Sequence, residues 1–146
     1  MKEFEFVAPR QRNLIPEGDE ARHAKLVRLQ DVLHLAWGPD TCADWQRYKW
    51  TPDNPAFGQS AVTALVVQDF VGGSIIKDCD HDHYWNILDG GTEVDLSREQ
   101  FNESLKLQAN QNRSRVYMLE SDRSIEARTP ERYDLLKERV IAYLGF

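Results

Sequence analysis

Apolar side chains recur at helical spacing in two stretches of the chain, and each stretch has its own boundary signal. The first stripe consists of Leu26, Leu29, Leu33, Ala36 and Trp37. The second consists of Tyr133, Leu136, Val140, Tyr143 and Leu144. Gly38-Pro39 ends the first stripe, and Thr129-Pro130 offers an N-cap and a first-turn proline to the second. The pattern therefore predicts an amphipathic helix at each place.

Between these stripes, residues 60–70 are apolar almost all round. The segment begins at Ser60 and ends before Gly72-Gly73. A helix that is apolar on every side is a buried one. We therefore expect a buried helix with Ser60 in its first turn.

A strand pattern follows the buried helix. Residues 74–77, 82–88 and 92–96 read as strands, and Asp89-Gly90-Gly91 joins the last two as a hairpin loop. These segments predict a small antiparallel sheet packed against the buried helix, and so an α+β fold.

The remaining segments are less regular. We expect an irregular arm over residues 1–18 and a loop over 39–58 that is pinned by Trp45, Tyr48, Trp50 and Phe57. Ser97 to Gln100 matches a capping box and predicts a short helix through Leu107. Residues 108–114 read as a loop, and 116–119 as a short strand.

Length and charge narrow the class of protein. A chain of 146 residues suits one domain over 1–146. The balance of 18 basic and 24 acidic residues gives a net charge of −6 without a basic stripe, which argues against nucleic acid and anionic membranes as partners. Small molecules or other proteins are the expected partners.

The two cysteines, Cys42 and Cys79, show neither CxxC pairing nor the density of a secreted disulfide framework. The sequence also contains no membrane-length apolar run and no signal-peptide pattern. We therefore expect a cytoplasmic protein.

The candidate chemistry lies in the order Ser60, His83, Asp95, which is that of an acyl-transfer triad of the thiol type. A nucleophile in the first turn of a helix benefits from unpaired N–H groups and the positive end of the helix dipole. Gly58 permits a sharp turn into that position. The alternative is that Ser60 only caps a buried helix, which is a common role for serine.

Hairpin register decides whether the other two residues can meet. With Asp89, Gly90 and Gly91 as the loop, Trp85 lies opposite Asp95, and His83 becomes a diagonal neighbour of Asp95 on the same face. Asp95 would then fix the tautomer and orientation of His83. A loop of two or four residues would put them on opposite faces, and a structural sheet histidine is the alternative interpretation.

A metal site is a rival interpretation. Cys79, His81 and His83 alternate as neighbours on one face of a strand would, and Asp95 could add a fourth ligand suited to zinc. The spacing is not a standard zinc pattern, and we predict no bound metal and no cofactor.

Two resemblances bear on this site. Residues 58–64, His83-Tyr84-Trp85 and 94–97 resemble the Gly-Gln-Cys, His-x-Trp and Asp-Pro-Thr segments of transglutaminases. Residues 54–70, Gly72-Gly73, 83–86, 93–96 and 98–101 resemble the small bacterial proteins of the YunG-like family, strongly over about residues 27–101 and weakly in the tail.

The resemblance implies a papain-like or transglutaminase-like core, in which a nucleophile-bearing helix packs on a small antiparallel sheet that carries the histidine and the aspartate. It implies a cysteine nucleophile at position 60, His83 as general base and then acid, and Asp95 as the orienting carboxylate. This chain has Ser60 instead, as a natural or an engineered replacement or as a natural serine enzyme. Oxygen in place of sulfur raises the nucleophile's pKa by several units above the roughly 8.5 of a thiol.

Four further residues are predicted to bind substrate: Gln59, Trp50, Trp85 and Asn86. The backbone N–H of Ser60 is the preferred oxyanion donor, with the indole of Trp50 or Trp45 as an alternative. Packing inside the fold is the structural alternative for each of these side chains.

These observations predict an acyltransferase or an amide or thioester hydrolase that works through a covalent acyl intermediate at position 60. The acyl donor would be a small molecule or a peptide, free or bound to a carrier protein. One alternative is a catalytically silent module that binds a ligand or peptide in the same cleft, and another is a metal-dependent hydrolase.

Overall fold

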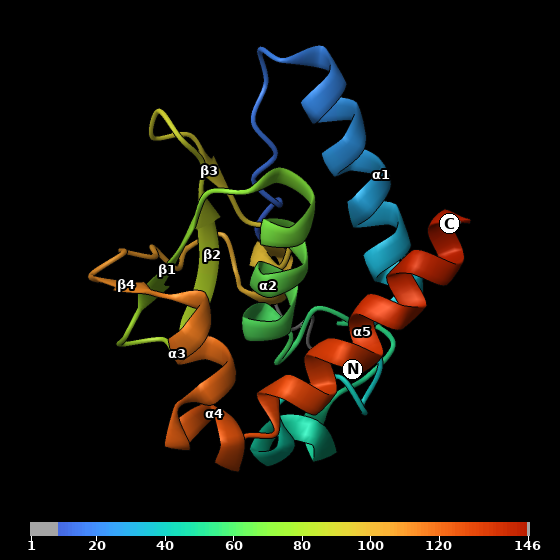
Figure 1. Cartoon of the computed structure of the whole chain (residues 1–146), viewed down its shortest axis with the longest axis vertical. Helices are drawn as coiled ribbons and strands as arrows, with labels where there is room; N and C mark the ends of the chain where they lie inside the picture. Colours follow the sequence, from blue (N-terminus) through green and yellow to red (C-terminus); the bar gives the residue numbers. More distant parts are fainter. Residues whose placement is uncertain (1–8, 146) are drawn as a thin grey trace, which may run out of the picture.

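The computed structural model describes residues 9–145, and its central element is the helix α2 (Ser60–Val71). Figure 1 shows α2 between a small sheet on one side and the helices α1 (Glu20–Ala36) and α5 (Thr129–Leu144) on the other. Ser60, Val62 to Val67 and neighbouring core side chains are buried, because α2 is covered on both sides. The buried helix predicted over residues 60–70 is confirmed.

The helix α1 forms where the first apolar stripe predicts it. Asp19 is its N-cap and accepts a hydrogen bond from the Arg22 amide, which satisfies one of the free N–H groups of the first turn. Its buried face consists of Leu26, Leu29, Val32, Leu33 and Ala36. The helix ends before Gly38-Pro39, as the sequence predicts.

The sheet has four antiparallel strands in the order β3-β2-β1-β4. The strands are β1 (Ser74–Asp78), β2 (His83–Ile87), β3 (Glu93–Val94) and β4 (Gln111–Arg113). The β2–β3 hairpin has the predicted register, because Leu88 N–H donates to Thr92 O and Asn86 pairs with Val94. The three predicted strands and the three-residue loop are confirmed.

The edge strand β4 corrects the prediction of a loop over residues 108–114. Its three polar residues pair with β1 through Ile75, Ile76 and Lys77. The burial of β4 is slight, since Gln111 and Asn112 are exposed. A short polar edge strand lacks the apolar alternation that sequence reasoning uses to find strands.

Two short helices, α3 (Arg115–Glu120) and α4 (Asp122–Glu126), replace the strand predicted over residues 116–119. Ser114 and Ser121 are their N-caps, each accepting from the amide three residues on. The strand prediction was wrong because it weighed the apolar run and overlooked the two serine caps.

The helix predicted through Leu107 is also absent. Only a single 3₁₀ turn, η2 (Arg98–Gln100), follows Ser97. The Ser97 hydroxyl donates to Asp95 Oδ1 at 3.4 Å instead of capping a helix. The match to a capping box was therefore misleading, because the serine is engaged by the preceding carboxylate.

The last helix, α5, starts at Thr129, with Arg128 rather than Thr129 in the N-cap position and in a left-handed conformation. Tyr133, Leu136 and Val140 are buried as predicted, whereas Tyr143 is exposed. The helix packs against both α1 and α2. It thereby closes the side of the core opposite the sheet (Figure 1).

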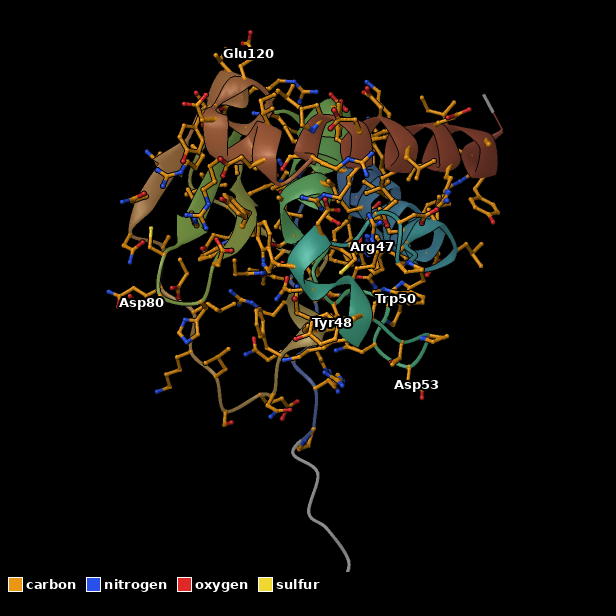
Figure 2. All side chains as sticks on the ribbon, turned by 90° about the horizontal axis from the view of Figure 1, so that it is seen from below. Arg47, Tyr48, Trp50, Asp53, Asp80 and Glu120 are labelled. Atoms are coloured by element: carbon orange, nitrogen blue, oxygen red, sulfur yellow. The ribbon has the colours of Figure 1, made fainter. Side chains whose placement is uncertain are left out.

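The connection from α1 to α2 contains the 3₁₀ helix η1 (Asp44–Lys49). Trp45 is 51% exposed and Tyr48 is 79% exposed, so these two aromatics do not pin the segment to the core as predicted. Figure 2 shows Arg47, Tyr48 and Trp50 along this segment. The Trp50 indole donates to Pro55 O at 3.0 Å, which ties the later part of the loop to itself.

Residues 9–18 are irregular and lie along the segment that follows β3. Isolated bridges join Arg10 to Asn102 and Leu14 to Asp95. Residues 1–8 of the predicted arm lie outside the described range. The whole is an α+β arrangement of helices and one small antiparallel sheet. Across residues 9–145, no helix combines the length and the apolar character needed to cross a membrane.

Candidate functional site

Ser60 is the first residue of α2, and its approach depends on Gly58. Gly58 has φ +70°, and a Cβ there would lie 2.4 Å from Cys42 Sγ, so only glycine fits this turn without a shift. The Ser60 side chain is 8% exposed, and its Oγ accepts a hydrogen bond from the Tyr84 amide at 3.2 Å. The first amides of α2 have no partners within the helix. The hydroxyl therefore lies at the N-terminal end of a buried helix and against strand β2.

The bond to Tyr84 also limits how far Ser60 Oγ is from the backbone of His83. The Tyr84 nitrogen is covalently linked to His83, so Ser60 Oγ lies within about 6 Å of His83 Cα from the bond to Tyr84 and standard backbone dimensions. The structure thus brings the first residue of α2 to the first residue of β2.

His83 and Asp95 form the buried pair that the hairpin register predicts. His83 Nε2 lies 2.7 Å from Asp95 Oδ2, and each residue is 1% exposed. The His83 ring stacks on Trp85 at a centroid distance of 5.6 Å and meets the edge of Phe101 at 4.8 Å. The imidazole is therefore held in one orientation by both its hydrogen bond and its packing.

The second nitrogen of His83 has no hydrogen-bond partner. Nδ1 is buried, and no donor or acceptor among residues 9–145 lies in bonding geometry to it. Buried polar atoms are nearly always paired, so an exception calls for a reason. With Nε2–H donating to Asp95, Nδ1 carries a free lone pair, which is the form of imidazole that can accept a proton.

Asp95 accepts from more than the histidine. The Ser97 amide donates to Oδ1 at 3.2 Å, and Arg98 Nε donates to Oδ2 at 3.3 Å. Its own backbone exchanges two hydrogen bonds with Leu14. These donors fix the buried Asp95 carboxylate in place beside the His83 imidazole.

A cavity of about 90 Å³ opens beside Ser60. Its walls come from α2, from the loop before it, from the start of β2, from η2 and from the C-terminal helices. The wall includes Ala43, Gln46, Ser60, Arg123, Ala127 and Arg132. We call this space the Ser60 cavity.

Of the predicted catalytic and substrate-binding residues, only Ser60 lines the Ser60 cavity. His83 and Asp95 are not among its wall residues, and the four residues predicted to bind substrate each donate a hydrogen bond inside the fold. Gln59 Nε2 donates to Gly38 O and Asn86 Nδ2 to Ala64 O, both at 2.9 Å. The Trp50 indole donates to Pro55 O and the Trp85 indole to Glu93 Oε1. The structural alternative therefore describes their contacts.

Two residues of the cavity wall, Gln46 and Arg132, were not predicted from the sequence. Gln46 lies close to Gly58, since a Cβ there would approach its Oε1 to 3.2 Å, and no spacing in the sequence connects it to Ser60. Arg132 is buried on α5, four residues before Leu136 and eight before Val140. A charged residue at helical spacing from Leu136 and Val140, at the start of an apolar stripe, was the signal that could have identified Arg132.

The thiol of Cys42, which lies near Gly58, is not activated. Burial raises the pKa of Cys42 to about 11, against a smaller opposing effect of Arg132. A thiol of this kind is almost fully protonated at neutral pH and is a poor nucleophile. Cys42 is thus not an activated nucleophile beside Ser60.

The residues of the rival metal interpretation are separated. His81 Nδ1 bonds Asp78 Oδ2, His83 bonds Asp95, and Cys79 is exposed. Within residues 9–145 no three His, Cys, Asp or Glu side chains are grouped as metal ligands would be.

Comparison of the sequence with known proteins identifies a family. The family model described as "YunG protein" matches residues 25–145. The chain is also 39% identical over 69 residues to "Uncharacterized protein YunG" of Bacillus subtilis (strain 168). That match covers 44% of this chain and 59% of the Bacillus protein, less than two thirds of its length. No solved structure matches the chain.

Proposed function

The chain belongs to the YunG family, and we propose that position 60, His83 and Asp95 form an acyl-transfer site of the thiol type on a papain-like or transglutaminase-like core. The observation that carries the proposal is the state of His83. Its Nε2 is bound to Asp95 at 2.7 Å, and its Nδ1 is buried without a partner. A general base needs that combination of a fixed ring and a free lone pair.

Each residue then has a defined role. The group at position 60 attacks the acyl carbonyl carbon, and His83 Nδ1 takes its proton and passes it to the leaving group. Asp95 holds the ring and stabilises the imidazolium that forms. The free amides at the start of α2 would serve as donors to the oxyanion that forms at the attacked carbonyl. Water or an amine then releases the acyl group.

Serine at position 60 alters the rate rather than the arrangement. A hydroxyl has a much higher pKa than a thiol, so it does not form the thiolate–imidazolium pair on which thiol enzymes rely. In addition, Ser60 Oγ is engaged by the Tyr84 N–H. We therefore infer that this chain binds its acyl donor and turns it over slowly, and that cysteine at position 60 restores fast acylation.

A second candidate is a ligand-binding module without catalysis. The engagement of Ser60 Oγ by a backbone amide favours it, since an oxygen fixed in that way serves structure. The two candidates make different predictions for the Ser60→Cys variant. The module gains an ordinary cysteine, whereas the acyl-transfer site gains an activated one.

The test uses Ser60→Cys in a Cys79→Ser background, because Cys79 is an exposed thiol that would react with any probe. At pH 6, iodoacetamide should modify Cys at position 60 at least about tenfold faster than a free thiol with a pKa near 8.5, because only an ion-paired thiolate persists there. Nitrophenyl acetate should transfer one acetyl group to position 60 with release of one nitrophenolate, both followed by mass spectrometry and absorbance.

Two further variants give the proposal its control. His83→Gln in the same background should lower the modification rate at pH 6 at least about tenfold, since the imidazolium partner is lost. His23→Gln, which changes a histidine of α1 that bonds Pro16 O, should leave the rate unchanged. Circular dichroism confirms that each variant is folded. An inert cysteine at position 60, or one that reacts equally well without His83, would overturn the acyl-transfer proposal.

A further inference from the structure

A buried positive charge lines the Ser60 cavity. Arg132 is 3% exposed, and its side chain reaches the cavity wall from the first turn of α5. Nε donates to Ala127 O and Nη1 to Thr41 O, both at 3.0 Å, and Nη2 donates to Thr129 Oγ1 at 3.2 Å. All of these acceptors are uncharged, so the charge of the guanidinium is solvated only by dipoles.

Arg132 differs in this respect from Arg139, two turns further along the same helix. Arg139 forms an ion pair with Asp40. Within residues 9–145, no Asp or Glu oxygen lies within 4.0 Å of a side-chain nitrogen of Arg132. Buried charges are normally paired, because an unpaired one is costly to remove from water.

The charges around Arg132 do not supply the missing partner. Asp44 is the acidic group that favours the charged form of Arg132, but its Oδ1 is already bound to Arg47 at 3.0 Å. Arg47 and Arg128 both disfavour that charge. Arg132 thus has two arginines and only one carboxylate among the charged groups that act on it, although the chain as a whole carries a net charge of −6.

The guanidinium also has donors to spare. It carries five N–H groups in a planar fork, and the contacts to Ala127, Thr41 and Thr129 use three of them, one on each nitrogen. One N–H on each terminal nitrogen is left. Two N–H groups are as many as the two oxygens of one carboxylate can accept from, one each.

We propose that the Ser60 cavity binds a carboxylate group of its ligand through Arg132. This proposal rests on the proposed function, and it identifies the acyl donor as a molecule that also bears a carboxylate. The carboxylate would lie at the Arg132 end of the cavity and the acyl carbonyl at position 60. Arg123, another cation of the cavity wall, adds to the positive field, although Asp82 partly neutralises it. A ligand carboxylate would give Arg132 the counter-ion that the fold does not provide.

Succinate is a suitable probe, with neutral succinamide as its matched control at equal ionic strength. In NMR titrations of the unaltered chain, succinate should shift the Arg132 side-chain Nε–H resonance and the Ala43 and Ala127 amides in a saturable way. Succinamide should do so at least about tenfold more weakly, as expected for the loss of a charge-assisted pair. Equal effects of the two compounds, no saturable effect of succinate, or shifts by inorganic phosphate where succinate gives none would overturn the proposal.

Two matched variants locate the effect. Arg132→Lys keeps the charge and removes the planar fork, and it should weaken succinate binding at least about tenfold. Arg139→Lys changes the paired arginine of the same helix and should leave binding within about twofold of the unaltered chain. Because the titration of the unaltered chain stands alone, loss of folding in Arg132→Lys would not remove the test.

The outcome is independent of catalysis at position 60. A chain that binds succinate through Arg132 while Ser60→Cys stays inert would keep the carboxylate site at Arg132 and overturn the proposed function, and with it the assignment of the ligand as an acyl donor. A reactive Ser60→Cys chain in which no carboxylate perturbs Arg132 would keep the proposed function and overturn this inference.

Discussion

The conformation of one residue, Gly58, sets the position of the Ser60 hydroxyl. Its φ of +70° is one that L side chains rarely adopt, and a Cβ would collide with Cys42 Sγ. Gly58→Ala should lower the free energy of unfolding by about 2–5 kcal/mol, the sum of left-handed strain and overpacking. Urea denaturation followed by tryptophan fluorescence measures this loss.

Gly90→Ala is the matched control for the strain alone. Gly90 has φ +91° in the hairpin loop, and nothing lies within 4 Å of the position that a Cβ would take there. Gly90→Ala should lower the free energy of unfolding by about 1–2 kcal/mol, because only the strain of the left-handed backbone contributes. Combining Gly58→Ala with Cys42→Ala should be less costly than the sum of the two, because the colliding sulfur is gone. Equal losses at Gly58 and Gly90 would contradict the packing argument.

At the residue scale, the sequence predicted the contact between His83 and Asp95, but not the hydrogen bonds of the four residues expected to bind substrate. The contact of His83 with Asp95 followed from hairpin parity, which is local and depends on a three-residue loop. The internal bonds of Gln59 and Asn86 could not be foreseen, because their acceptors, Gly38 O and Ala64 O, are more than 20 residues away in the chain. Arg132 was missed because its surroundings come from several distant segments.

At the element scale, a pair of titratable side chains joins α1 to η2. His34 Nε2 lies 2.5 Å from Glu99 Oε1. The hydrogen bond to Glu99 raises the pKa of His34 above its ordinary 6.5, against a smaller opposing effect of burial. The pair therefore links the first helix to the turn that follows Asp95.

The raised pKa fixes the sign of the pH dependence. The folded chain keeps the His34 proton to a higher pH than the unfolded chain does, so the pair stabilises fully below about pH 6.5 and loses its effect as the pH rises through the folded pKa. Glu99→Gln should therefore destabilise the fold more at pH 5.5 than at pH 9, by less than about 1 kcal/mol because both groups are partly exposed. Glu103→Gln, on an exposed neighbour, should show no such pH dependence. An equal loss for Glu99→Gln at both pH values would contradict the assignment.

Elements with a strong period were predictable, and short polar ones were not. The helices α1, α2 and α5 are long and carry continuous apolar faces or runs, so local pattern and tertiary packing agree. The strand β4 is exposed and polar, and its existence depends on the edge that β1 offers. The short helices α3 and α4 depend on serine caps that the apolar pattern does not reveal.

At the scale of the whole molecule, Cys42 lies where the connection between α1 and α2 meets the last helix, α5. Its sulfur faces Gly58 before α2, and the guanidinium of Arg132 on α5 binds the neighbouring Thr41 carbonyl. Cys42 has no exposed surface, whereas Cys79 is exposed. Modification of Cys42 therefore requires that the contact of α5 with the loop before α2 opens.

This arrangement predicts that Cys42 reports global unfolding. In Cys79→Ser, iodoacetamide at pH 8 should modify Cys42 at least about 10³-fold more slowly than it modifies Cys79 in Cys42→Ala, because stable domains populate the open state at or below that fraction. With rising urea, the midpoint of Cys42 modification in short pulses should coincide with the midpoint from circular dichroism. Coincidence would mean that the loop, α2 and α5 unfold as one unit around the Ser60 cavity. Modification well below the unfolding midpoint would instead show that the cavity wall opens locally, and the arrangement of Arg132 and Ser60 would then not be a rigid one.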